Sequence, residues 1–171
     1  MYDEAFMRRA IALSEQALGV PGAGPFAAVI VRDGAIVGEG INRSRAKYDP
    51  TSHGEVEAIR DACDRLKSVD LSGCDLYTTC EPCTMCVATM LVAGIGRLYY
   101  GASAQQSGSI VARFRTIASD DLRREAGLPI GERRMPAEQK LAVEAMAVLE
   151  KWADAAPGRR NAGPGPNRQA R

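Results

Sequence analysis

The spacing of hydrophobic positions divides the first 101 residues into helices and strands. Apolar side chains recur every three or four residues over 3–17, which predicts an amphipathic helix with Asp3 as its N-cap. Two apolar runs flank the pair Asp33-Gly34, which is typical of a β-hairpin with a two-residue turn. The same criteria predict strands at 26–31, 35–41, 75–79 and 97–101 and further helices at 56–66 and 83–92.

This order of elements predicts an α/β domain. Strands that alternate with helices are typical of crossovers over the faces of a sheet, so we expect a three-layer α/β/α fold. Its central sheet is expected to be mixed, antiparallel at the hairpin and parallel where helices cross over. Beyond residue 102 the pattern is weaker. It suggests a short helix over 117–124, a fifth strand over 131–135 and a helix over 137–155.

The composition indicates one globular domain followed by a tail. The chain has 171 residues, of which 46% are hydrophobic and 25% charged, and we place a single domain at residues 1–156. Residues 157–171 hold three prolines, three glycines and four arginines, so this tail is expected to be disordered. A net charge of +1 argues against a strongly cationic nucleic-acid coat protein.

The sequence contains no signal peptide that we recognise. The N-terminus is charged and has no continuous apolar core. The most apolar run, 87–95, is too short to span a bilayer. We therefore expect a soluble cytoplasmic protein without a membrane partner.

Residues that can bind a metal gather in two short segments, His53-Gly54-Glu55 and Pro82–Cys86. Each segment stands at the start of a predicted helix. Cys83 and Cys86 lie one turn apart on one helix face, where the positive end of the helix dipole favours the thiolate form. The chain has one histidine and an odd number of cysteines, five, which does not suggest a disulfide framework.

Together these residues predict a catalytic zinc site. His53, Cys83 and Cys86 would supply one nitrogen and two sulfurs, which leaves a fourth tetrahedral position for water. Zinc lowers the pKa of such a water to about 7. Glu55 could carry a proton from that water to a ring nitrogen and a leaving amine. A His-x-Glu and a Pro-Cys-x-x-Cys segment are the signature of zinc-dependent base deaminases.

Two other interpretations of the cysteines stay open. Cys83 and Cys86 could form a redox-active pair, which would hold little zinc. Alternatively, Cys80 could join His53, Cys83 and Cys86 in a closed Cys₃His site. Such a site could not activate water, and the protein would then be a structural-zinc interaction module without enzymatic activity.

The chain resembles the cytidine and deoxycytidylate deaminase superfamily, and within it the small bacterial guanine deaminases. The similarity runs from about the first helix to Gly101. The segments that carry it are Gly24–Val31, Asn42, Asp49–Val56 and Cys80–Cys86, and the last two contain the metal-binding motifs.

The resemblance implies a fold, a cofactor and a set of site residues. The fold would be cytidine deaminase-like, with Zn²⁺ held by His53, Cys83 and Cys86. Glu55 would be the proton shuttle. The resembled enzymes are homodimers, which implies a second copy of this chain as a partner. The remaining implied roles concern the substrate: Asn42 contacts the base, Phe26 lines the pocket and the Gly54 amide touches the substrate.

The expected function is guanine deaminase-like hydrolysis of a free aminated nucleobase, with release of ammonia. Two departures bear on this expectation. Gly54 replaces the usual alanine between His and Glu, and 103–108 lacks the acidic, aromatic segment that helps to hold a purine. A tRNA-specific adenosine deaminase is the main alternative, because such enzymes share Asn42 and Asp49-Pro50-Thr51; only this alternative involves a nucleic acid. Deamination of cytosine, isocytosine and related rings also stays open.

Overall fold

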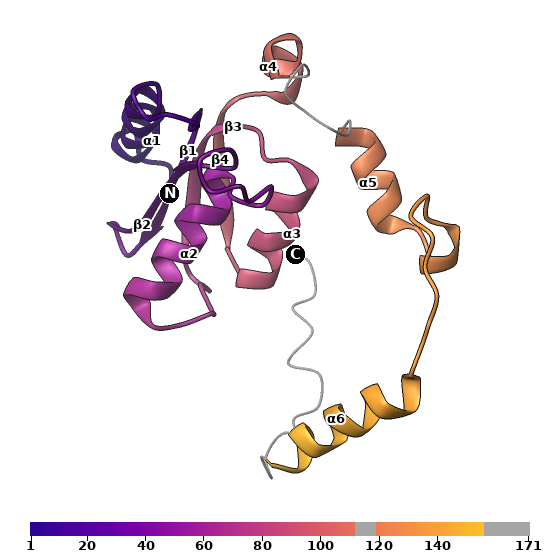
Figure 1. The fold of residues 1–171 in the computed structure, drawn as a ribbon. Coiled ribbons are helices and arrows are strands. Elements are labelled where there is room, and N and C mark those ends of the chain that lie inside the picture. The colour runs from indigo at the N-terminus through magenta and orange to yellow at the C-terminus, as the bar shows by residue number, and fades with distance from the viewer. Residues whose placement is uncertain (112–118, 156–171) are drawn as a thin grey trace. The chain divides into compact units, whose positions relative to one another are not determined.

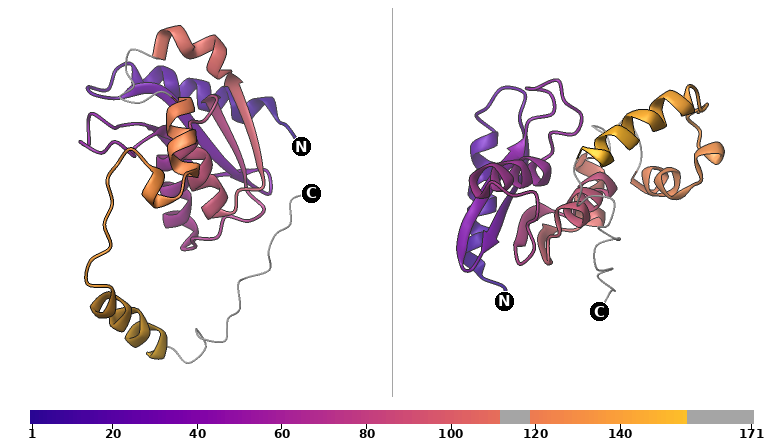
Figure 2. Two further views of the ribbon diagram at one scale, coloured as in Figure 1. Left: turned by 90° about the vertical axis from the view of Figure 1, so that its right-hand side faces the viewer. Right: turned by 90° about the horizontal axis from the view of Figure 1, so that it is seen from below.

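A mixed sheet with the strand order β2-β1-β3-β4 forms the centre of the computed structural model, which describes residues 1–111 and 119–155. β1 (Gly24–Arg32) pairs antiparallel with β2 (Ala35–Asn42) and with β3 (Asp75–Cys80), whereas β3 and β4 (Arg97–Ala102) are parallel. α1 (Glu4–Ala17) covers one face, and α2 (Gly54–Leu66) and α3 (Thr84–Ala93) cover the other (Figure 1, Figure 2). The predicted three-layer architecture is confirmed.

The central strand β1 is buried on both sides, which explains its nearly continuous apolar sequence. Ala28 and Ile30 pack in the core beneath α2 and α3. Ala27, Val29 and Val31 alternate with them and pack in the core beneath α1. Because successive side chains of a strand point to opposite faces, one short run of residues supplies both cores.

Two glycines allow α2 to lie directly on β2. A Cβ added at Gly38 would come within 2.5 Å of the Ala58 carbonyl oxygen. A Cβ added at Gly40 would lie 2.3 Å from the Gly54 carbonyl oxygen. A side chain at either position would push the helix away from the sheet. The absence of these side chains therefore sets the position of the α2 N-terminus, where the candidate metal ligand His53 lies.

The described part of the sheet has four strands, so the predicted fifth strand is wrong. Residues 131–132 instead belong to a 3₁₀ turn, η2 (Ile130–Glu132), and 133–135 continue as bends. Arg133 Nε donates to the Leu128 carbonyl oxygen at 3.0 Å. Three consecutive charged residues, 132–134, interrupt the apolar alternation that a half-buried strand requires. Glu132 N donates to the Pro129 carbonyl oxygen at 2.9 Å, so the backbone forms a local turn here and not a sheet ladder.

Among the described residues, three α-helices follow β4: α4 (Ala104–Val111), α5 (Ser119–Gly127) and α6 (Ala142–Asp154). α5 overlaps the helix predicted over 117–124, of which residues 117–118 lie outside the described residues. α6 begins five residues later than predicted, after Leu141, whose φ is 50°. The chain divides into two units, Met1–Ala126 and Gly127–Arg171. The single domain over 1–156 stays a prediction, and the predicted tail, 157–171, lies outside the described residues.

Among the described helices, none combines the length and the apolar character needed to cross a membrane.

Candidate metal centre and active site

The candidate metal ligands lie at the N-termini of two neighbouring helices. His53 is the N-cap residue of α2, and Cys83 is the N-cap residue of α3. Both have an extended backbone, and neither side chain caps its own helix. Cys86 lies in the first turn of α3 and is fully buried. Since α2 and α3 pack side by side on one face of the sheet, these three side chains meet.

The three side chains form a small triangle that fits a zinc ion. His53 Nδ1 lies 3.4 Å from Cys86 Sγ and 3.6 Å from Cys83 Sγ, and the two sulfurs are 3.6 Å apart. Ligands at ordinary zinc distances in a tetrahedron are separated by about 3.3–3.8 Å. One imidazole nitrogen and two thiolates are also the donors that zinc prefers. The donor set and its spacing therefore suit a catalytic site with an open fourth position.

Cys80 does not join this triangle. Its thiol donates to Ser107 Oγ at 3.3 Å, and Ser107 Oγ donates in turn to the Ser103 carbonyl oxygen at 2.9 Å. In the described chain, the cluster of possible metal ligands consists of His53, Cys83 and Cys86. The closed Cys₃His arrangement considered from the sequence is therefore not formed.

The two candidate thiol ligands differ in their tendency to ionise. The pKa of Cys83 falls to about 3, chiefly because of a hydrogen bond between its sulfur and that of Cys86, with His53 adding to the effect. The same hydrogen bond raises the pKa of Cys86, and burial and the nearby Glu55 carboxyl raise it further. Cys83 is thus poised as the thiolate, which is the form that binds zinc.

Glu55 lies in the first turn of α2, two residues from His53 and buried. Burial raises the pKa of its carboxyl group, while the nearby imidazole of His53 and a hydrogen bond with Cys86 act in the opposite direction. The pKa of the carboxyl group thereby lies closer to neutral pH, and a group whose pKa is near the working pH can both accept and release a proton. The carboxyl group therefore lies beside the thiol of Cys86 and has the properties of a proton carrier.

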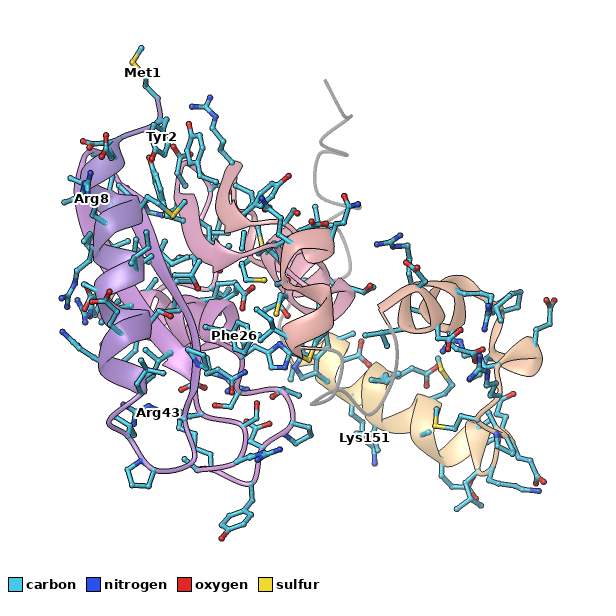
Figure 3. All side chains as sticks on the ribbon, turned by 90° about the horizontal axis from the view of Figure 1, so that it is seen from above. Met1, Tyr2, Arg8, Phe26, Arg43 and Lys151 are labelled. Atoms are coloured by element: carbon cyan, nitrogen blue, oxygen red, sulfur yellow. The ribbon has the colours of Figure 1, made fainter. Side chains whose placement is uncertain are left out.

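The three residues expected to contact a substrate lie close together. Phe26 is half-buried at the start of β1, where the pairing with β2 is irregular between Gly24 and Ala27 (Figure 3). Gly24 pairs with Asn42 at the end of β2, and a Cβ added at Gly24 would lie 3.3 Å from the Phe26 ring and 3.5 Å from the Asn42 amide carbon. Asn42 Oδ1 accepts a hydrogen bond from Ser44 N at 3.1 Å, which orients the amide.

Gly54 supports the backbone of Phe26. A Cβ added at Gly54 would lie 2.6 Å from the Phe26 carbonyl oxygen and 3.0 Å from Ala27 Cα. Backbone atoms cannot yield to such a contact without a shift of β1. The glycine therefore allows the start of β1 to approach α2 more closely than an alanine would. The position of the Phe26 backbone therefore depends on a glycine, and not an alanine, between His53 and Glu55.

We expect the substitution Gly54→Ala to lower the free energy of unfolding by about 1–3 kcal/mol, because the new methyl group overlaps β1. Urea unfolding followed by circular dichroism measures this change. Gly108→Ala is the matched control, since Gly108 lies in α4 with open space around its Cβ position. That control should be neutral or stabilising. Equal stability of Gly54→Ala and the unmodified protein would contradict the close packing described above.

The sequence did not predict α4, although a signal for it exists. Ser103 Oγ accepts from Gln106 N at 3.1 Å, and Gln106 Oε1 accepts from Ser103 N at 2.8 Å. This reciprocal pair is the capping box of the pattern Ser-x-x-Gln. Glu81 Oε2 also accepts from Ala104 N at 2.7 Å. With the Cys80–Ser107 contact, these bonds attach α4 to the segment that leads into the Cys83–Cys86 motif.

Comparisons with known proteins identify relatives of this chain. Residues 1–102 match the family described as the cytidine and deoxycytidylate deaminase zinc-binding region. Guanine deaminase of Bacillus subtilis is 38% identical over 154 residues, covering 89% of this chain and 94% of the relative. Its X-ray structure superimposes with a TM-score of 0.79 at 35% identity, covering 91% of this chain and 96% of that chain.

A second group of relatives acts on RNA. The tRNA-specific adenosine deaminase of Agrobacterium fabrum is 45% identical over 91 residues. The match covers 53% of this chain and 60% of that relative. The similarity to this enzyme is therefore confined to about half of this chain, whereas the similarity to the Bacillus enzyme extends over nearly all of it.

Proposed function

This chain belongs to the cytidine and deoxycytidylate deaminase family and is a hydrolytic deaminase, and we propose that its substrate is a free nucleobase of the guanine type. The observation that carries the proposal is the triangle of His53, Cys83 and Cys86 beside the buried carboxyl group of Glu55. A nearly complete alignment with the Bacillus guanine deaminase supports a small base as the substrate.

In the proposed mechanism, His53, Cys83 and Cys86 hold a zinc ion. When bound there, zinc supplies a Lewis acid that makes hydroxide available near neutral pH. Glu55 accepts a proton as water adds to the carbon that bears the amine. It delivers this proton to the adjacent ring nitrogen and then assists the departure of ammonia. The ring gains a carbonyl oxygen and loses the amino group.

The substrate is proposed to lie between the start of β1 and the N-terminus of α2. Phe26 would form one wall of the site, and the Asn42 amide would hydrogen-bond a ring edge. Gly54 is the first residue of α2, and the amides at a helix N-terminus have no carbonyl partner inside the helix. The Gly54 N–H would therefore be oriented toward an electronegative atom of the base.

One observation favours a tRNA substrate instead. The loop that follows Asn42 carries Arg43, Arg45 and Lys47, and Tyr48 at its tip is 95% exposed with a φ of 52°. Exposed aromatic rings among cationic side chains are suited to stacking on the bases of single-stranded nucleic acids. This loop makes the anticodon arm of a tRNA the second candidate substrate.

Ammonia release from a panel of substrates tests the proposal. The zinc-loaded protein is incubated with guanine, adenine, cytosine, isocytosine, their nucleosides and a tRNA anticodon stem-loop. We expect release from guanine. Release from the stem-loop alone would replace the proposal with the tRNA function, and release from a pyrimidine alone would replace it with the cytosine-type activity. No release from any member, with zinc tightly bound, would overturn the proposed function.

We also propose a homodimer as the working form. α3 exposes Leu91 and Val92, which are 73% and 88% accessible, and neighbouring β4 exposes Tyr100. Apolar side chains grouped on one helix and the adjacent edge strand are suited to contact with a second copy. Sedimentation velocity at micromolar concentration distinguishes a dimer of about twice the 18.3 kDa chain mass from a monomer, which would contradict the proposal.

A further inference from the structure

We propose that Arg60 is a positioning residue that holds His53 in place for metal binding, acting through the loop 49–53. The proposal rests on the proposed function only in that it takes His53 as a zinc ligand. Arg60 lies in α2, about two turns after His53, and it has no contact with the ligand triangle itself. It acts through the residues that immediately precede His53.

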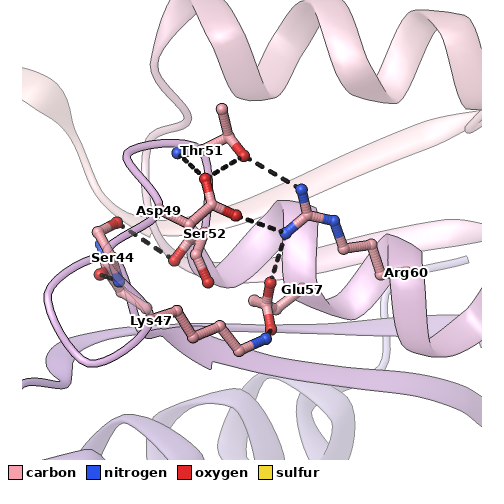
Figure 4. Close-up of polar contacts among 8 residues, drawn as sticks. Ser44, Lys47, Asp49, Thr51, Ser52, Glu57 and Arg60 are labelled. Atoms are coloured by element: carbon pink, nitrogen blue, oxygen red, sulfur yellow. Dashed lines mark hydrogen bonds and ion pairs between the residues drawn. The ribbon is translucent and has the colours of Figure 1, made fainter.

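The guanidinium group of Arg60 joins three acceptors (Figure 4). Its Nη1 donates to Glu57 Oε1 at 2.7 Å and to Asp49 Oδ2 at 3.3 Å. Its Nη2 donates to Thr51 Oγ1 at 3.1 Å. A planar guanidinium presents several donors in fixed directions, so one side chain can fasten the loop to the helix at two points. A lysine ammonium offers a single centre and could not span the same acceptors.

The contacts continue from Asp49 to the backbone of His53. Asp49 Oδ1 accepts from Thr51 N at 2.8 Å and from Thr51 Oγ1 at 2.7 Å, which closes a tight turn. These hydrogen bonds lower the pKa of the Asp49 carboxyl, with Arg60 contributing, so the group is a carboxylate at neutral pH. The Thr51 carbonyl oxygen in turn accepts from His53 N at 2.7 Å. Arg60 is thus linked to the His53 amide through Thr51, both directly and by way of Asp49.

A second set of bonds ties the same loop to the substrate side of the site. Ser52 is fully buried, and its carbonyl oxygen accepts from Arg43 N at 2.9 Å, next to Asn42. The Glu57 carboxylate accepts a hydrogen bond from Arg60 on one oxygen and from Lys47 on the other. The Glu57 N–H donates to the His53 carbonyl oxygen at 2.9 Å. The network therefore spans the loop from the residue after Asn42 to the metal ligand.

The partners of Arg60 differ from those that the helix pattern suggests. Spacing on α2 predicts an ion pair between Arg60 and Asp64, but Asp64 pairs with Lys67 and Arg60 turns toward the loop. An acidic residue that follows a basic one by four positions is the weaker orientation for such a pair. Arg60 therefore pairs with Glu57 one turn earlier on its own helix and with the loop acceptors Asp49 and Thr51, rather than with Asp64.

Zinc retention by the full chain tests the proposal. Zinc-loaded protein is mixed with an excess of a chromogenic chelator, and the rate of metal release is measured well below the unfolding temperature. We expect Arg60→Met to release zinc about 10–100-fold faster, in line with the loss of metal affinity that follows removal of an orienting partner. Arg60→Lys should recover part of this loss. The double variant with Asp49→Asn should be no worse than Arg60→Met alone, because both changes break the same link.

Arg65→Met is the matched control. Arg65 lies on the same helix with a 51% exposed side chain, against 50% for Arg60, and pairs with Asp61 at 2.8 Å. It does not contact the loop, so we expect it to release zinc at the unmodified rate even if it loses similar stability. Release from Arg60→Met at the unmodified rate, or equal acceleration in Arg65→Met, would overturn the proposal. If Arg60→Met does not fold, the zinc release rates of Asp49→Asn and Arg60→Lys are compared with those of the unmodified protein and Arg65→Met instead. Release at the unmodified rate from both would overturn the proposal.

The outcome separates this proposal from the proposed function. A protein that releases no ammonia from any base, yet loses zinc faster when Arg60 is replaced, supports Arg60 as a positioning residue and contradicts the nucleobase activity. A protein that deaminates guanine and whose Arg60→Met variant keeps both its zinc and its kcat overturns only the role of Arg60.

Discussion

Replacement of Glu55 with Gln is expected to lower kcat by a factor of about 100 to 10,000 and to leave one zinc bound per chain. The amide has nearly the shape of the carboxyl group, so the buried space between α2 and Cys86 stays filled. It cannot accept a proton from water or pass one to the ring. Ammonia release under saturating substrate and zinc content by elemental analysis measure the two effects.

A second carboxylate provides the control for this prediction. Glu39 lies on β2 and forms a bidentate ion pair with Arg9, whose Nε and Nη2 donate to the two carboxylate oxygens at 2.7 and 2.8 Å. Glu39→Gln also neutralises a partly buried carboxylate, and it should leave kcat within a factor of about two because it touches none of the reacting groups. A fully active Glu55→Gln variant would remove Glu55 from the mechanism. Loss of zinc from that variant would show instead that the carboxyl group supports the metal site.

The site could be predicted from sequence because its information is local. His53 and Glu55 are two residues apart, and Cys83 and Cys86 are three apart, so each motif fixes its own geometry at a helix start. The alternation of strands and helices then places both helix starts on one side of the sheet. These two facts bring four side chains together without any knowledge of long-range packing.

What the sequence could not provide depends on contacts between distant segments. The effect of Gly54 depends on the carbonyl oxygen of Phe26, which is 28 positions away in the chain. The choice of Arg60 between Asp64 and the loop depends on where the loop returns. The strand predicted at 131–135 does not form for a local reason, because three adjacent charged residues, 132–134, outweigh a weak apolar pattern.

Separate substitutions of Cys83 and of Cys80 distinguish a zinc site with an open fourth position from a site closed by four protein ligands. Cys83→Ala removes one of three proposed ligands, so we expect less than one zinc per chain. Because ligand binding stabilises only the folded protein, the loss should remove about 4 kcal/mol when free zinc exceeds the dissociation constant a thousandfold. Differential scanning calorimetry with and without a chelator measures this contribution.

Cys80→Ser provides the comparison, because the Cys80 thiol contacts Ser107 and lies outside the triangle. We expect this variant to keep one zinc and to retain most of its ammonia release, with at most a small loss of stability from the altered packing of a buried side chain. A chelator should lower the unfolding temperature of the unmodified protein and of Cys80→Ser, and it should have little effect on Cys83→Ala. Loss of zinc from Cys80→Ser would mean that four protein ligands enclose the metal, and a site closed in that way has no position for a reacting water.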